Sequence, residues 1–65
     1  MNKNKIRRAM LRDKEEELIR HQITEDYLMN RIEDNEETAR RQSLVEVRKI
    51  IHELECQIEF LKKQI

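Results

Sequence analysis

One apolar stripe in the C-terminal third constrains this chain more than any other feature of its sequence. From residue 44 onward, apolar side chains follow one another at alternating spacings of 3 and 4 residues. The stripe consists of Leu44, Val47, Ile51, Leu54, Ile58, Leu61 and Ile65. This spacing is typical of the a and d positions of a heptad, through which one helix packs against another. The sequence therefore predicts a helix that buries this stripe against a partner helix.

The residues beside the stripe leave the direction of the partner helix open. Ile50 lies at a flanking g-type position and widens the apolar surface. Isoleucine at a with leucine at d favours a parallel two-stranded coiled coil. The g and e positions, however, carry no pair of opposite charges that would fix a parallel register. An antiparallel hairpin that doubles into a four-helix bundle is the other arrangement that fits.

Composition points to a helical assembly rather than a self-sufficient monomer. A chain of 65 residues buries only about 60% of the surface that its unfolded form exposes. Such chains are usually stabilised by disulfides, metals or oligomerisation. A single cysteine excludes an intrachain disulfide, and the absence of Gly and Pro with 43% charged residues suits long helices with solvated faces. We therefore expect oligomerisation.

A first helix is expected over residues 4 to about 32. Its apolar residues fall on one broad side of a helix, where Lys14, His21 and Glu25 interrupt them. These apolar residues are Ile6, Met10, Leu11, Leu18, Leu28, Met29 and Ile32. A second stripe of Ile19, Ile23 and Tyr27 runs at i, i+4 and i+8 on roughly the opposite side. These three side chains are either simply exposed at the edge of a bundle or contact a further neighbour or target.

A polar segment separates this helix from the second one. Residues 33–38 contain no apolar side chain, and the apolar phase shifts across them, as expected for a turn at about 33–36. Asp34 with Glu37 fits a capping box, and so does Ser43 with Glu46. The second helix therefore begins near residue 36 or near residue 44, and we favour the earlier start, which gives a helix over about 36–65. A continuous kinked rod is the rival arrangement.

Together these patterns predict one all-α domain over residues 1–65. It is a helical hairpin with C-terminal coiled-coil heptads, and two copies form a four-helix bundle. The expected oligomer interface consists of Leu44, Val47, Ile50, Ile51, Leu54, Ile58, Leu61 and Ile65 with Leu11, Leu18, Leu28 and Ile32.

Catalytic and metal-binding patterns find little support in the sequence. There is no glycine-rich phosphate loop, no H-E-x-x-H and no Cys–His–acid set on separate elements. His52 and Cys56 are four residues apart on one helix face, but two ligands fall short of a zinc site. We therefore expect no enzyme, no metal and no cofactor.

No apolar run is long enough for a membrane span or a signal peptide, so a cytoplasmic protein with a reduced thiol is expected.

The function that these features favour is protein–protein interaction. The expected protein is a small homo-oligomeric adaptor, inhibitor or regulator, of a kind that phages and mobile elements encode. Its candidate contacts with a target are the side chains off the predicted seam, namely Ile19, Ile23, Tyr27 and Phe60. An alternative is a scaffolding element that only assembles. It would form species larger than a tetramer whose size changes with concentration.

A dimeric nucleic-acid-binding regulator is the main rival function. Its candidate contacts are the basic residues near the N-terminus, Lys3, Lys5, Arg7, Arg8 and Arg12. Asn4 and Arg12 stand at the N-x7-R spacing, which resembles the basic regions of leucine-zipper transcription factors. In size and expected hairpin form the chain also resembles the Rop-type plasmid proteins, dimeric four-helix bundles that bind paired RNA loops. Against this function, the net charge is zero and an acidic cluster follows at residues 13–17.

Overall fold

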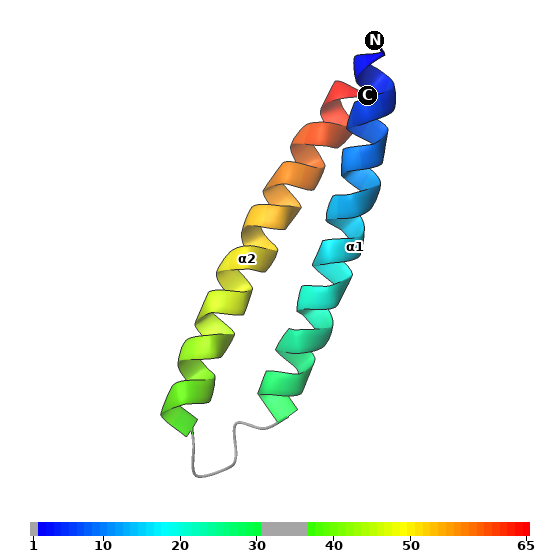
Figure 1. The fold of residues 1–65 in the computed structure, drawn as a ribbon. Helices are drawn as coiled ribbons and strands as arrows, with labels where there is room; N and C mark the ends of the chain where they lie inside the picture. Colours follow the sequence, from blue (N-terminus) through cyan, green and yellow to red (C-terminus); the bar gives the residue numbers. More distant parts are fainter. Residues whose placement is uncertain (1, 31–36) are drawn as a thin grey trace.

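Two long helices lie side by side and antiparallel in the computed structural model of this protein (Figure 1). The structure describes residues 2–30 and 37–65, with side chains of the second range from residue 39 onward. Helix α1 spans Lys3–Asn30 and helix α2 spans Glu37–Gln64, and the particle measures 53 × 14 × 14 Å. The expected all-helical fold with two packed helices is confirmed, and the described residues contain no strand.

The first turn of α1 is capped by a side chain that precedes it. The Asn4 backbone N–H donates a hydrogen bond of 3.0 Å to Asn2 Oδ1. An asparagine at this position satisfies one of the backbone donors that the first turn of a helix leaves unpaired. The helix therefore begins at Lys3, one residue earlier than expected.

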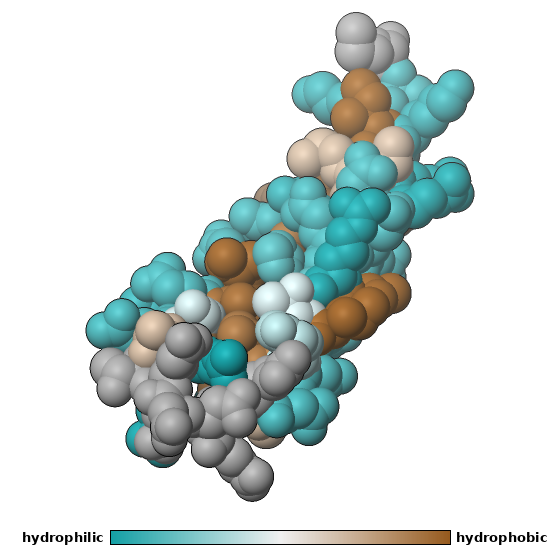
Figure 2. Space-filling view, turned by 60° about the horizontal axis from the view of Figure 1, so that its bottom comes forward, coloured by the Kyte–Doolittle hydropathy of each residue, from teal (hydrophilic) through white to brown (hydrophobic). Residues whose placement is uncertain are grey.

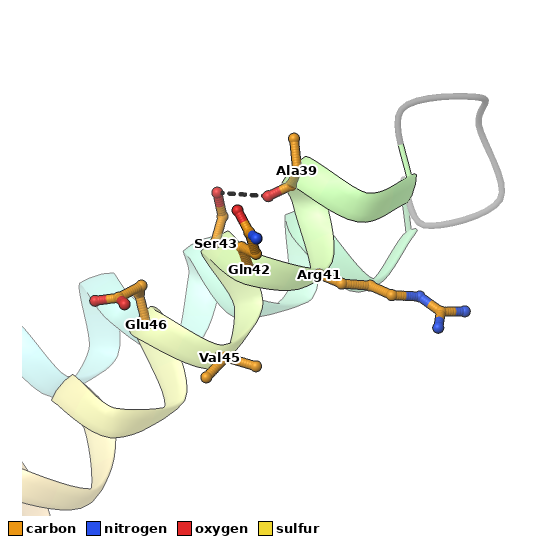
Figure 3. A pocket seen from close by; sticks show the side chains of 6 residues that line it. All are labelled: Ala39, Arg41, Gln42, Ser43, Val45 and Glu46. Atoms are coloured by element: carbon orange, nitrogen blue, oxygen red, sulfur yellow. Dashed lines mark hydrogen bonds between the residues drawn. The ribbon is translucent and has the colours of Figure 1, made fainter.

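The start of α2 decides between the two capping boxes of the sequence. Because α2 begins at Glu37, the start near residue 44 is wrong. Ser43 lies inside the helix, where its hydroxyl donates a 3.1 Å hydrogen bond to the Ala39 carbonyl (Figure 3). Serine in a helix interior often bonds back in this way instead of capping. The expected turn and Asp34 lie outside the described residues.

The core of the helix pair comes from α2. Among the described residues, the buried side chains are Leu44, Leu54, Ile58 and Leu61, with 4% to 7% of their surface exposed. Val47 and Ile51 are half-buried beside them, and Figure 2 shows hydrophobic surface between the two helices. The predicted stripe thus faces α1 within the same chain. Ile50 and Ile65 lie at its margin, 42% and 43% exposed.

The face of α1 that covers this core is mixed in character. No side chain of α1 is buried, and its half-buried residues are Arg7, Leu11, Lys14, Glu17, Leu18, His21, Glu25 and Leu28. Charged and polar groups therefore alternate with leucines along the contact. Such side chains place their apolar stems against the core and keep their polar ends in water. As a result α1 covers the α2 stripe only partly, and Ile32, expected in this contact, lies outside the described residues.

A polar contact joins the two helices toward the loop end. The Arg48 Nε group lies 3.0 Å from Glu25 Oε2, and Arg48 Nη2 lies 3.7 Å from the Met29 sulfur. The Arg48 side chain is 52% exposed, so solvent screens this ion pair and it contributes about 0.5 kcal/mol. The pair shows that residues 25 and 48 lie opposite each other in the antiparallel arrangement.

Candidate protein-binding surfaces

Three large side chains stand on the side of α1 that faces away from α2. Ile19, Ile23 and Tyr27 follow one another at i, i+4 and i+8, and they are 57%, 63% and 57% exposed. Residues four apart on a helix lie one above the other, so the three side chains form one continuous strip. We call this strip the outer stripe. Figure 2 shows hydrophobic surface on the outside of the molecule as well as between the helices.

Two local contacts lie beside the outer stripe. Arg20 Nη2 lies 2.6 Å from Glu16 Oε1, an ion pair between residues one turn apart. Thr24 Oγ1 donates a 3.2 Å hydrogen bond to the Arg20 carbonyl. These contacts are local to α1 and leave the apolar strip uncovered. The stripe therefore lies within one continuous helix, a kind of element on which binding sites are more precise than on loops.

The fourth predicted contact residue belongs to a different surface. Phe60 is 61% exposed and lies on α2, beside Met10 of α1 and Leu61. The outer stripe occupies the side of α1 turned away from α2. The four residues singled out in the sequence therefore fall on two surfaces.

His52 and Cys56 lie close together on the exposed side of α2. The Cys56 sulfur is 3.8 Å from His52 Nε2, and the thiol is free and exposed. In residues 2–30 and 37–65 no group of three or more His, Cys, Asp or Glu side chains is placed to hold a metal ion. Two ligands leave a tetrahedral zinc ion half-coordinated. This pair is therefore a surface contact in the single chain.

A hollow of about 940 Å³ lies against the first turns of α2. Figure 3 shows its lining side chains, which all come from this helix and are all exposed: Ala39, Arg41, Gln42, Ser43, Val45 and Glu46. They radiate from the helix in different directions rather than converging on one point. A catalytic or ligand-binding pocket instead buries most of its ligand and brings polar groups together. This hollow lacks both features.

The basic residues near the N-terminus fall into two groups. Lys5, Arg8 and Arg12 are exposed, and their spacing of 3 and 4 residues places them on the same side of α1 as the outer stripe. Arg7 is half-buried, and its Nη1 group donates a 3.0 Å hydrogen bond to Asn4 Oδ1. Asn4, part of the N-x7-R spacing, is thus engaged within the helix. Lys3 is exposed in the first turn.

Comparisons with protein-family models, with curated proteins and with solved structures give no match to this chain. Among the described residues, no helix is both long and apolar enough to cross a membrane.

Sequence reasoning missed two features of these surfaces. One is the cross-helix pair of Glu25 and Arg48, which becomes visible only when the antiparallel register is known. The other is the grouping of Met10 with Phe60, because the first was expected on the inner face of its helix and the second off the predicted seam. Both are about 50% exposed or more, at 46% and 61%. Pairing the two apolar patterns in an antiparallel register would have brought these two residues together.

Proposed function

We propose that this chain is a small homo-oligomeric helical module that binds another protein, acting as an adaptor, inhibitor or regulator. The observation that carries the proposal is the outer stripe. It exposes Ile19, Ile23 and Tyr27 on a side of α1 that α2 does not cover. Large apolar side chains scattered singly on a surface are ordinary, whereas grouped ones more often mark contacts.

The side chains of the outer stripe suit binding to an apolar groove or helix on a partner protein. Anchors at successive turns of one helix face are the arrangement by which a helix enters an apolar groove. Full burial of an isoleucine side chain contributes about 1.5–3 kcal/mol. Tyrosine is enriched among the residues that dominate binding energy because it combines apolar area with a polar tip. Three such side chains therefore form a cluster of the kind that dominates the binding energy of an interface.

Self-association is supported by the surface area of the single chain. A compact monomer of 8.1 kDa exposes about 4,500 Å², whereas this helix pair exposes 5498 Å². The excess of roughly 1,000 Å² is comparable to the share of about 800 Å² that each partner buries in an interface of standard size. A dimer of helix pairs forming a four-helix bundle would remove this excess.

The test is comparative capture with a variant of the outer stripe. Immobilised wild-type protein and the I19A/I23A/Y27A variant are exposed to the same lysate, and V45A serves as the control because Val45 is 51% exposed on α2. A protein retained by wild type and V45A, but not by the triple variant, is then purified. The triple variant should bind it with a Kd at least about a hundredfold higher.

The same experiment contains the result that would contradict the proposal. The triple variant should keep the helical content and the mass of the wild type, because its substitutions lie off the contact with α2. If the oligomer instead dissociates, the outer stripe is a self-association surface and not a target contact. Equal binding of the purified protein to all three proteins would also overturn the assignment.

A nucleic-acid-binding function is a second candidate, favoured by one specific observation. Lys5, Arg8 and Arg12 form an exposed basic row on one side of α1. If each of these three side chains contacts one phosphate, affinity for duplex nucleic acid should fall about fortyfold between about 50 and about 200 mM salt. The K5Q/R8Q/R12Q variant should then lose both the binding and the salt dependence. Absence of binding at low salt would exclude this function.

A further inference from the structure

The two long sides of the helix pair differ in the side chains that they expose. On one side a groove of about 460 Å³ runs between the helices. Its lining is Met10 and Lys14 from α1 with Glu53, Cys56, Gln57, Phe60 and Leu61 from α2. Leu61 is buried, whereas Met10 and Phe60 are 46% and 61% exposed. The groove therefore connects the apolar core to the surface.

Further apolar residues extend this groove in both directions. Ile50 lies two helical turns before Gln57, so it is on the same side of α2, and it is 42% exposed. Ile6 lies about one turn before Met10 on α1 and is 45% exposed. We call the surface formed by Ile6, Met10, Ile50 and Phe60 the apolar side.

The opposite long side carries ionised groups beside its apolar residues. A hollow there is lined by Leu18 and Ile58 together with Glu55, Glu59 and Lys62. Nearer the loop end, Arg41 and Arg48 line the surface with Met29, Leu44 and Val45, and Arg48 is paired with Glu25. Burying this side would remove several ionised groups from water, which costs several kcal/mol per ion. A partner that buries apolar surface therefore binds more favourably on the apolar side.

We propose that a second copy of this chain docks on the apolar side, so that two helix pairs pack face to face. This inference rests on the proposed homo-oligomer and names the surface through which it forms. A two-fold pairing brings the same patch together from both copies and so needs no second kind of surface. It buries Met10 and Phe60, extends the core beyond Leu61, and accounts for the excess surface of roughly 1,000 Å².

Charge at the edge of the groove also suits a second copy. Lys14 borders the groove from α1 and Glu53 borders it from α2. A two-fold axis along the bundle places each α1 over the partner's α2, so the helix that carries Lys14 faces the helix that carries Glu53. Opposite charges at the rim of an interface contribute little energy but favour the correct pairing.

The first test measures mass by light scattering after size exclusion under reducing conditions. The wild type should have about twice its chain mass of 8.1 kDa, whereas M10E/F60E should have the mass of one chain. The matched control is I19E/I23E, which places the same two charges on the outer stripe and should remain dimeric. A monomeric wild type overturns the inference, and so does a dimeric M10E/F60E variant, whatever the mass of I19E/I23E.

A second measurement uses the unsubstituted chain and therefore does not depend on the folding of a variant. Cys56 lines the groove, so a docked copy should shield its thiol. The rate of Cys56 alkylation should fall roughly tenfold as rising protein concentration converts monomer into dimer. A constant rate across a concentration range in which the mass doubles would place the interface elsewhere.

Failure of this inference is distinguishable from failure of the proposed target binding. M10E/F60E retains the outer stripe, so this monomeric variant should still bind the purified target. If M10E/F60E binds the target but is still a dimer, the wild type dimerises through another surface and only the proposed docking surface is wrong. If wild type and M10E/F60E both fail to bind any target, the proposed target binding is wrong. The dimer surface is then judged by the mass and alkylation measurements alone.

Discussion

His21 occupies a position on the inner face of α1 where an apolar residue would serve the helix pair better. It is half-buried, one turn after Leu18, on the face that covers the α2 stripe. Substitution H21L should raise stability by about 1 kcal/mol through added apolar burial. This corresponds to a rise of about 4–8 °C in Tm for a domain of this size.

The control for this prediction is the other histidine of the chain. His52 is exposed on α2, so H52L should change Tm by much less than H21L when both are measured at the same protein concentration. A lower Tm for H21L would mean that the imidazole makes a favourable polar contact in the folded protein. The mixed inner face of α1 would then fit the α2 stripe well.

The ion pair between Glu25 and Arg48 allows a second prediction at the residue scale. Substitution E25Q keeps the shape of the side chain and removes its charge, so stability to urea should fall by about 0.5 kcal/mol at low salt. At about 1 M salt most of the difference from wild type should disappear because Arg48 is half exposed and solvent reaches the pair. E15Q, at an exposed position on the same helix, should show no such difference. A loss from E25Q that persists in high salt would contradict an exposed, screened pair.

At the scale of the elements, the two helices differ in how far their sequences specify their packing. The stripe of α2 could be predicted because its apolar residues keep one period without interruption, and Leu44, Leu54 and Ile58 are indeed buried. In α1 the same period is broken by Lys14 and His21, so its pattern indicates a broad side rather than a definite seam. The inner face of α1 is defined by the partner helix rather than by its own periodicity.

The hairpin was predicted although the sequence signals for helix direction conflict, but which residues lie opposite each other could not be predicted. Isoleucine at a and leucine at d favour parallel pairing, whereas the polar break at residues 33–38 favours a hairpin. The register depends on contacts between distant residues, such as Glu25 with Arg48, which no local pattern contains. The grouping of Met10 with Phe60 on one side follows from the same register, so that surface was hidden for the same reason.

This difference between the helices predicts how each behaves as an isolated peptide. A peptide of residues 37–65 has the complete apolar stripe, so it should be helical at micromolar concentration and should associate with itself. A peptide of residues 3–30 has a mixed face and should be largely unfolded, because isolated helices in water are marginal without packing. Circular dichroism and light scattering measure both properties. An unfolded α2 peptide would mean that α1, despite its mixed face, is an essential part of the core.

At the scale of the whole molecule, the shape of the chain links its stability to its concentration. A rod of 53 × 14 × 14 Å made of two helices has a thin core, in which each helix has a single neighbour within the chain. A chain this small buries too little of its surface to be strongly stable alone. If folded chains pair, mass action stabilises the folded state in proportion to the logarithm of protein concentration.

Thermal unfolding should therefore depend on concentration in the wild type and in the outer-stripe variant I19E/I23E. Each tenfold increase in concentration should stabilise the folded dimer by about 0.7 kcal/mol per chain, which should raise Tm by a few degrees. In M10E/F60E the Tm should be lower and independent of concentration, because its charged side chains prevent burial of the apolar side. If the wild type shows the same Tm from about 1 to about 100 µM, the folded chain is stable as a monomer. The excess surface would then be tolerated, and neither the apolar side nor the outer stripe would be needed for folding.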